Sequence, residues 1–594
     1  MKKVLVIGSG ISGLTTAIEC ASRNIHVTMV SPFPSERAQS VLAAGGINAA
    51  LDHKGEGDSI ESHIEDTLKG GCYIAGREAV TGLCKTAPEI LAWLEHLGTV
   101  FSRTADGKID QRAFGGQSHR RTCYCGASTG KQIVTALVME ARRYEGLGLI
   151  ERLLWTDFHS GLIRDGVCYG ARLFNEGTRR LEDVTADAVV IATGGQNALF
   201  GKTTGSTQCD GYTAGKLFMQ GAELKNLEFI QYHPTTILTG QKKMLISEAA
   251  RGEGGRLYYE EGGKRVYFME EKYGEKGNLM PRDVVSRTMY ELHKPVFLDV
   301  SFLGKKKILE RIPEIYDICM KYRGIDISKE SIPVEPSVHF FMGGLAVNLN
   351  HETNIKNLYA VGECASIYHG ANRLGGNSLL AAVYSGRTAA KSIVDRLSDN
   401  TASSNDKLGD HTTTKSDNER YSNQSASKIS DNRYNNYTDK KLIDDNNNIS
   451  MTNDFAESLA DDQRKLEDGY KTSSSFSVMH VRKLLAELMQ ERLGIARNET
   501  ALKKGIDEVT FLLDNVDKLH FNASELPYFN YSINGILALA KATLVAAESR
   551  KETRGAHVRT DYPLTDDSLR AGTIISYDGG AFTTRLDTDH DYES

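Results

Sequence analysis

The chain has 594 residues and a net charge of −6, with 40% hydrophobic and 25% charged residues. This length predicts two or three domains, and the acidic balance excludes the basic footprint of a nucleic-acid-binding protein. Its apolar runs are too short for a transmembrane helix or a secretory signal, and nine cysteines in a chain of this size do not indicate a disulfide framework. We therefore expect a cytoplasmic protein without direct membrane insertion.

The first residues have the pattern of a doubly wound α/β fold. Residues 4–7 (VLVI) indicate a buried strand, a helical pattern follows through Ala21, and residues 26–30 (HVTMV) indicate the next strand. Two later segments, 186–195 and 357–363, each run from a buried strand into glycine. We expect all four strands to share one parallel sheet.

A glycine motif lies between the first strand and the first helix. Gly8, Gly10 and Gly13 form G-x-G-x-x-G, which admits a pyrophosphate against bare backbone at the start of a helix. Ser31 stands where such sites usually carry an acidic ribose ligand, and a serine bonds a ribose more weakly. The motif predicts a dinucleotide site but leaves FAD and NAD open.

Composition also predicts the domain boundaries. Residues 401–450 contain nine Asn and only five residues from Val, Ile, Leu, Met, Phe and Trp, which is typical of disorder. Beyond them, His480–Leu493 and Ile533–Ala547 show the apolar spacing of amphipathic helices. The predicted parts are a first nucleotide-binding segment (1–235), an inserted domain (236–340), a second nucleotide-binding segment (341–396), a disordered Asn-rich linker (397–455), a helical C-terminal domain (456–565) and a C-terminal tail (566–594). We expect the last residues, RLDTDHDYES (585–594), to be polar and frayed.

Nine further motifs occur in a fixed order along the chain. They are AAGGINAAL (43–51), GGQSHRR (115–121), ATGG (192–195), EFIQYHPT (228–235), SEAARGEGG (247–255), PRDVVSR (281–287), HFFMGGL (339–345), VGECASIYHGANRLGGNSLLAAVYSGR (361–387) and RGAHVRTDYP (554–563). This set resembles the succinate dehydrogenase/fumarate reductase flavoprotein subunit family, which includes L-aspartate oxidase. The resemblance implies a Rossmann-like FAD-binding domain, an inserted α+β capping domain and a C-terminal helical domain.

The resemblance also implies the cofactor and its contacts. Respiratory members of the family carry a histidine that bonds covalently to FAD, and this chain has Gln39 at that position. Glutamine cannot form the bond, so FAD should be non-covalent, which in the family goes with the fumarate-reducing direction. The expected FAD contacts are Gly8, Gly10, Gly13, Ser31, Ala44, Gly45, Gly46, Asn48, Glu363, Ser378 and Leu379.

A dicarboxylate needs cationic or hydrogen-bonding groups at both ends and a proton donor opposite the flavin. By resemblance, Arg282 is the proton donor, and Glu248 and Arg251 form its relay from solvent. An arginine acid is chemically unusual, but a carbanion-like centre is basic enough to take its proton. The carboxylate ligands implied by the resemblance are His339 with Arg373 at one end, and His233 with Ser247 at the other.

The residue at position 114 bears on the choice between two substrates. Aspartate oxidases place a glutamate there, which can pair with the substrate ammonium, whereas Phe114 suits an unsubstituted C4 dicarboxylate. The SHRR sequence and the 14-residue spacing from His233 to Ser247 are closer to aspartate oxidase. Phe114 and the VGECAS and HGANRLGGNSLLAA stretches favour the other choice, so we expect fumarate reduction. L-aspartate oxidase is the alternative, and a non-catalytic flavoprotein is a third interpretation.

Several residues of these motifs have no assigned role. His119, His369 and the Arg120–Arg121 pair could serve structure or substrate access, and Cys123 with Cys125 forms a C-x-C that we interpret as free thiols rather than a metal site. The sequence has no haem or iron–sulfur motif. Electrons should therefore come from an external partner, such as a reduced flavin, a small redox protein or an iron–sulfur subunit.

Overall fold

The four predicted strands lie in one parallel sheet. A computed structural model describes residues 2–126, 128–240, 242–405, 446–471 and 476–587. Its nucleotide-binding sheet has the order β19-β10-β1-β2-β6, and every neighbouring pair is parallel. The prediction of a doubly wound sheet is confirmed. The strands are β1 (Lys3–Ile7), β2 (His26–Ser31), β6 (Ile150–Leu154), β10 (Ala188–Ile191) and β19 (Leu358–Ala360).

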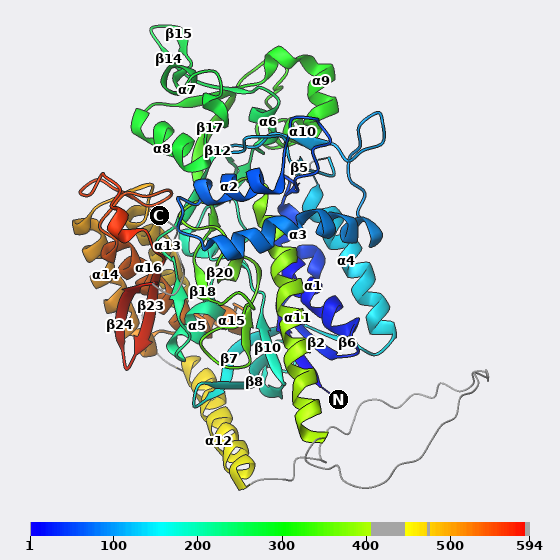
Figure 1. Ribbon diagram of the computed structural model, residues 1–594. Coiled ribbons are helices and arrows are strands. Elements are labelled where there is room, and N and C mark those ends of the chain that lie inside the picture. Colours follow the sequence, from blue (N-terminus) through cyan, green and yellow to red (C-terminus); the bar gives the residue numbers. More distant parts are fainter. Residues whose placement is uncertain (1, 127, 241, 406–445, 472–475, 588–594) are drawn as a thin grey trace, which may run out of the picture.

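Helices cover this sheet, as Figure 1 shows. Helix α1 (Ile11–Ala21) is buried along its whole length because it packs against α11 (Asn377–Asn405) and α4 (Thr129–Gly146) as well as the sheet. Close packing also explains Gly13, since a Cβ there would lie 2.1 Å from the carbonyl oxygen of Gly8. Two more helices and three short strands complete this part: α2 (Ile60–Gly70), α3 (Arg77–His96), β3 (Ile47–Asn48), β4 (Gln111–Arg112) and β5 (Thr122–Cys123).

A separate, antiparallel sheet has the order β7-β8-β9 and precedes β10 in the chain. Helix α5, which follows β10, contacts the C-terminal region. Helix α5 packs closely on α16, because a Cβ on Gly215 would lie 2.0 Å from the carbonyl oxygen of Gly535. The elements are β7 (Thr156–Arg164), β8 (Val167–Asn175), β9 (Arg180–Thr185), α5 (Tyr212–Met219) and α16 (Ile533–Ser549).

The inserted region forms its own layer at one end of the molecule (top of Figure 1). Its six-stranded sheet has the order β13-β12-β17-β16-β14-β15. Strands and helices of the inserted region together enclose a separate hydrophobic core. The long strands β12 and β17 pair antiparallel and carry the chain into and out of this layer. The elements are β12 (Ile230–Leu238), β13 (Lys243–Leu245), α6 (Ala249–Gly252), β14 (Arg256–Glu261), β15 (Lys264–Val266), α7 (Phe268–Tyr273), α8 (Arg282–Leu292), β16 (Val296–Asp299), α9 (Gly304–Arg311), α10 (Pro313–Arg323) and β17 (Ile332–Phe341).

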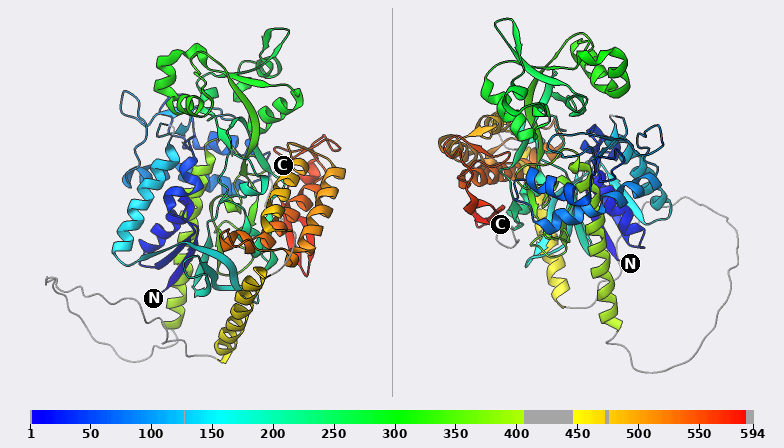
Figure 2. Two further views of the ribbon diagram at one scale, coloured as in Figure 1. Left: turned by 180° about the vertical axis from the view of Figure 1, so that it is seen from behind. Right: turned by 45° about the horizontal axis from the view of Figure 1, so that its top comes forward.

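Both amphipathic helices predicted in the C-terminal region are confirmed. They are α13 (Val478–Arg492) and α16, which stand with α14 (Glu499–Asp514) and α15 (Pro527–Tyr531) along one side of the nucleotide-binding body (Figure 2). A short parallel pair, β21 (Ala496–Arg497) and β22 (Val558–Arg559), ties this region together. Among the described residues, no helix is both long and apolar enough to cross a bilayer.

The segment predicted as a C-terminal tail (566–594) contains a β-hairpin, and its second strand continues to Leu586, inside the end that was expected to be frayed (585–594). Strands β23 (Thr573–Asp578) and β24 (Ala581–Leu586) form a hairpin that extends the sheet β20-β18-β11, and Asp587 pairs with the buried Lys225. Gly579 and Gly580 supply the positive φ of the turn, which is a hairpin signal. Residues 588–594 lie outside the described part. The other strands are β11 (Leu224–Lys225), β18 (Gly344–Ala346) and β20 (Ala365–Ser366).

The predicted linker (397–455) is too long at both ends. Helix α11 continues to Asn405 and α12 (Asn446–Gly469) begins before residue 455, while residues 406–445 lie outside the described part. Helix α12 docks on the β7-β8-β9 sheet, where the buried Arg172 donates to Asp462 at 2.5 Å and to Ser458 at 3.0 Å. This tertiary contact supports a polar helix that composition alone does not predict.

Candidate active site

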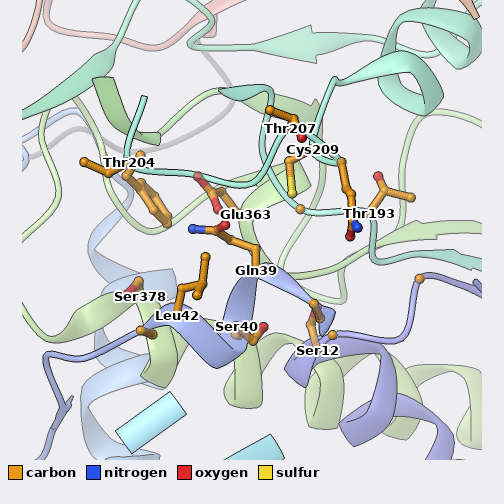
Figure 3. Close-up of a pocket in the computed structure, with 18 of the residues that line it drawn as sticks. Ser12, Gln39, Ser40, Leu42, Thr193, Thr204, Thr207, Cys209, Glu363 and Ser378 are labelled. Atoms are coloured by element: carbon orange, nitrogen blue, oxygen red, sulfur yellow. The ribbon is translucent and has the colours of Figure 1, made fainter. Parts of the chain in front are cut away.

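A single cavity of about 470 Å³ joins the glycine turn to a group of buried arginines. It collects residues from the sheet edge, the inserted region and the segments before α11. Figure 3 shows part of its wall. Most of the predicted site residues line it: Gly8, Gly10, Ser31, Ala44, Gly45, Gly46, Phe114, His233, Ser247, Glu248, Arg282, His339, Glu363, Arg373, Ser378 and Leu379.

Three predicted site residues lie behind the wall instead. Gly13 allows α1 to approach β1. Arg251 is buried beyond Glu248. Asn48 is fully buried, where its amide donates to the carbonyl oxygen of Gly375 and to Asn377 Oδ1, both at 2.7 Å. It therefore fixes the segment before α11 rather than lining the cavity.

The glycine-lined half of the cavity fits a dinucleotide. Gly8 has φ +113° and a Cβ there would lie 2.3 Å from the carbonyl oxygen of Ala192, so only glycine allows this turn. Gly10 is the N-cap of α1 and has no side chain to occupy the first N–H groups of the helix. The N–H of Ile11 donates to Ser40 Oγ at 3.3 Å, and the N–H groups of Ser12 and Gly13 that follow it are available to a phosphate, as the pyrophosphate of FAD requires.

Gln39 and Glu363 both line the middle of the cavity (Figure 3). Gln39 reaches inward from the segment that also bears Ser40 and Leu42, and its Oε1 accepts from the N–H of Ser206 at 2.6 Å. Glu363 accepts from the N–H of Phe341 at 3.1 Å, and burial raises the pKa of its carboxyl to about 7. A carboxyl in this position suits hydroxyl donors of a ribityl or ribose group.

The far end of the cavity contains residues that the sequence analysis missed. Thr156, Asp157 and Phe158 open strand β7, and Asp210 precedes α5. Asp210 accepts from the hydroxyl of Tyr528 at 2.8 Å. These residues line the same cavity as Ser31. No motif marks these residues; only the positive φ of Gly211 hints at a special turn.

Three of the buried charges form a continuous hydrogen-bonded chain. Arg282 donates to Glu248 Oε2 through Nε (2.9 Å) and a terminal nitrogen (2.7 Å), and Arg251 donates to Glu248 Oε1 at 2.9 Å. Burial acts to raise the pKa of Glu248, but the charges of Arg282 and Arg251 outweigh this effect and lower the pKa to about 2. Glu248 is thus a carboxylate between two guanidinium groups.

Two histidines face each other beside this chain, with ring centroids 5.1 Å apart. Burial lowers the pKa of His233 and His339 well below the usual value, so both rings are neutral at pH 7. The N–H of Thr235 donates to His233 Nδ1 at 3.2 Å, which leaves the ring proton on Nε2. That buried Nε2 has no hydrogen-bond partner within the described chain. It is a donor available to a ligand.

Charge balance gives this end of the cavity its preference. The three arginines Arg282, Arg373 and Arg251 outweigh the carboxylate of Glu248 and the carboxyl of Glu363, whose pKa is raised to about 7, so the region favours an anion. Ser247 and Phe114 also line it, and Phe114 is 2% exposed beside Gly45. The geometry can therefore hold a small dicarboxylate near the end of a bound dinucleotide.

The unassigned motif residues have structural roles. Arg121 is buried and pairs with Asp58 and Asp66, both at 2.8 Å. His369 packs edge-on against Phe340 at 5.3 Å. Outside the cavity lining are also His119, which contacts Ser118, Arg120, which pairs with Glu56, and the free thiols Cys123 and Cys125.

Comparisons with known proteins agree with this architecture. A family model described as an FAD binding domain matches residues 3–379, and one described as the fumarate reductase flavoprotein C-term matches residues 482–589. The succinate dehydrogenase flavoprotein subunit of Bacillus subtilis is 34% identical, over 95% of this chain and 92% of that protein. The fumarate reductase flavoprotein subunit of Haemophilus influenzae is 31% identical, over 95% of this chain and 90% of that protein.

Solved structures give the same answer. E. coli quinol fumarate reductase superposes with a TM-score of 0.81 at 28% identity, covering 99% of this chain and 97% of that one. The predicted fold class is confirmed: an FAD-binding domain with an inserted capping domain and a C-terminal helical domain. The chain belongs to the succinate dehydrogenase/fumarate reductase flavoprotein family.

Proposed function

We propose that this flavoprotein reduces fumarate to succinate with Arg282 as the proton donor. The observation that carries the proposal is the position of Arg282: it is buried, it lines the same cavity as the glycine turn, and it is hydrogen-bonded to a carboxylate that a second arginine also contacts. The family membership supports a succinate/fumarate-type substrate, and the comparisons do not favour L-aspartate oxidase.

The substrate is bound by groups that already point into the cavity. Arg373 and His339 bind one carboxylate, and the free Nε2–H of His233 and the hydroxyl of Ser247 bind the other. Neutral histidines suit this role because they donate hydrogen bonds without adding charge that would hold the product too tightly. When bound and reduced, FAD would supply the hydride that this reaction needs.

Arg282 then protonates the alkene carbon beside the one that receives the hydride. Before the proton leaves, the guanidinium charge of Arg282 stabilises the negative charge that develops on the substrate, while Glu248 holds the guanidinium in place. Reprotonation proceeds through Glu248 and Arg251, which are joined at 2.9 Å. Because Glu248 has a pKa of about 2, it accepts a proton only transiently and returns to the carboxylate.

The cofactor is non-covalent in this proposal, since Gln39 occupies the position of the flavin-linked histidine and its amide already accepts from the backbone of Ser206. Acid precipitation of the holoprotein should release all flavin into the supernatant. Electrons arrive from outside the chain. Because matched relatives are named as subunits, an iron–sulfur subunit is the first partner to test, at the cytoplasmic side of any membrane complex.

The decisive experiment uses anaerobic flavin spectra. Adding L-aspartate to the oxidised protein should leave the flavin band unchanged. Adding fumarate to protein reduced with dithionite should restore the oxidised band within seconds. Bleaching by L-aspartate would make the protein an aspartate oxidase, and bound flavin that responds to no dicarboxylate would indicate a non-catalytic flavoprotein.

A further inference from the structure

Two arginines that line the cavity come from different parts of the chain and share one acceptor buried behind the cavity wall. Arg282 begins helix α8 of the inserted region, and Arg373 lies in the segment before α11 of the nucleotide-binding body. Gln231, on strand β12 between them, accepts from Arg282 at 3.0 Å and from Arg373 at 2.9 Å through the same Oε1 atom. Gln231 lies inside the EFIQYHPT motif (228–235), two residues before His233.

The Gln231 amide has a fixed orientation. Its Nε2 donates to Asn372 Oδ1 at 2.7 Å and to the carbonyl oxygen of Arg373 at 2.8 Å. Asn372 in turn donates to Asp283 Oδ1 at 2.8 Å, which crosses back to helix α8. Reversing the amide would point its NH₂ group at two guanidinium groups and leave both acceptors unsatisfied. Gln231 and Asn372 are almost completely buried, so water cannot replace these bonds.

Electrostatics explains why such an acceptor is needed. Arg282 and Arg373 carry like charges in a buried site, and burial followed by the charge of Arg282 lowers the pKa of Arg373. A carboxylate between them would hold both, but it would also cancel much of the positive charge that attracts a dianionic substrate. A neutral amide oxygen holds the two cations and leaves their charge available.

We propose that Gln231 is a positioning residue that sets the separation of the substrate-binding Arg373 and the proton-donating Arg282 across the boundary between the inserted region and the nucleotide-binding body. Asn372 and Asp283 keep its oxygen turned toward the two guanidinium groups. This inference rests on the proposed function, because it needs both arginines to act on one dicarboxylate.

Two variants of similar size distinguish the effect of losing the hydrogen-bond acceptor from the effect of adding a negative charge. Gln231→Met removes the acceptor and adds no charge. Gln231→Glu retains an acceptor and adds a negative charge. Gln220→Met is the matched control, because Gln220 bridges the backbone of Gly161 by two 2.9 Å bonds and does not line the cavity. For each protein, the measurements are fumarate turnover, the dissociation constant of the unreactive dicarboxylate malonate from the flavin spectrum, the FAD content and the unfolding temperature.

Gln231→Met should have the larger effect on kcat, and Gln231→Glu the larger effect on the dissociation constant of malonate. Gln231→Met should lower kcat about 100-fold, because a small displacement of reacting groups has an effect of that order. Gln231→Glu should lower kcat less, but it should raise the dissociation constant of malonate about tenfold or more, and more than Gln231→Met does. The control should match the wild type in both. A merely structural glutamine would lower the unfolding temperature and FAD content without separating kcat from malonate affinity.

The outcomes separate this inference from the proposed function. If the wild type binds malonate and reduces fumarate, and Gln231→Met does both within twofold, only the inference fails. If the wild type does neither, the proposed function fails and the inference with it. Should Gln231→Met not fold, Gln231→Glu decides: unchanged malonate affinity overturns the inference, and weakened affinity with retained FAD supports it.

Discussion

The two ends of the cavity are built in different ways. At the glycine turn of the nucleotide end, contacts come from backbone and from glycines close together in the sequence, such as Gly8 and Gly10 on either side of one turn. At the substrate end, they come from side chains of distant segments, including Glu248, Arg282 and Arg373. The glycine turn depends on positions that have no side chain, whereas the substrate end depends on the balance of buried positive and negative charges.

This difference determines how each end should respond to mutation. A glycine that allows a backbone approach cannot be replaced without moving the backbone, so the damage reaches the fold. A buried arginine that contacts Glu248 and Gln231 can be removed with the nucleotide end intact, so the damage should stay in the chemistry. The following predictions test that separation, in order of decreasing effect.

The largest effect is expected at the nucleotide end, for Gly8→Ala. The new Cβ would lie 2.3 Å from the carbonyl oxygen of Ala192, at a φ of +113°. We expect loss of bound FAD together with a lower unfolding temperature, since overpacking of this kind costs about 2 kcal/mol. Flavin absorbance and thermal unfolding measure this. Gly146→Ala is the control, because no atom lies within 4 Å of its Cβ. FAD retained at wild-type level would show that the turn is not rigid.

At the substrate end, Arg282→Ala should abolish fumarate reduction, by at least about 10³-fold, and leave FAD bound. Turnover with a reduced artificial donor, together with the flavin spectrum, measures both. Arg287→Ala is the control on the same helix, where Arg287 pairs with the exposed Glu291. Retention of most of the activity would remove Arg282 from the role of proton donor.

Position 114 tests substrate choice at the same end. Phe114→Glu places a carboxylate where the ammonium of L-aspartate would lie, and should shift the preference toward aspartate over fumarate by about tenfold. Phe114→Leu keeps the site apolar and should retain the fumarate preference. Relative flavin reduction by aspartate and reoxidation by fumarate measure the change. An unchanged ratio would mean that Phe114 does not distinguish the substrates.

The smallest effect concerns the middle of the cavity. Burial raises the pKa of Glu363 from 4.5 to about 7 in the FAD-free protein, so the folded state holds a proton that the unfolded chain has lost. This stabilisation is complete below pH 4.5 and disappears as the pH rises through 7. Over that interval, the unfolding temperature of the FAD-free wild type should fall about 3 °C more than that of Glu363→Gln. Parallel curves would show that Glu363 is ionised at pH 5.

The structure bears out the sequence predictions that depend on local patterns. The four strands of the parallel sheet, helix α1 and the two C-terminal amphipathic helices lie where periodicity predicted them. Predictions from composition were less successful. The hairpin of β23 and β24 lies in a segment that was expected to be only a tail, and α12 depends on its contact with the buried Arg172.

The site divides in the same way. The sequence by itself determined the glycine turn, because a short strand, three glycines and a helix are consecutive, and it determined the family through ordered motifs. Only the tertiary structure placed Thr156, Phe158 and Asp210 at the far end of the cavity, and only it joined Gln231 to two arginines. The physical reason is that hydrogen bonds between buried charges depend on distance and direction, which a linear spacing does not contain.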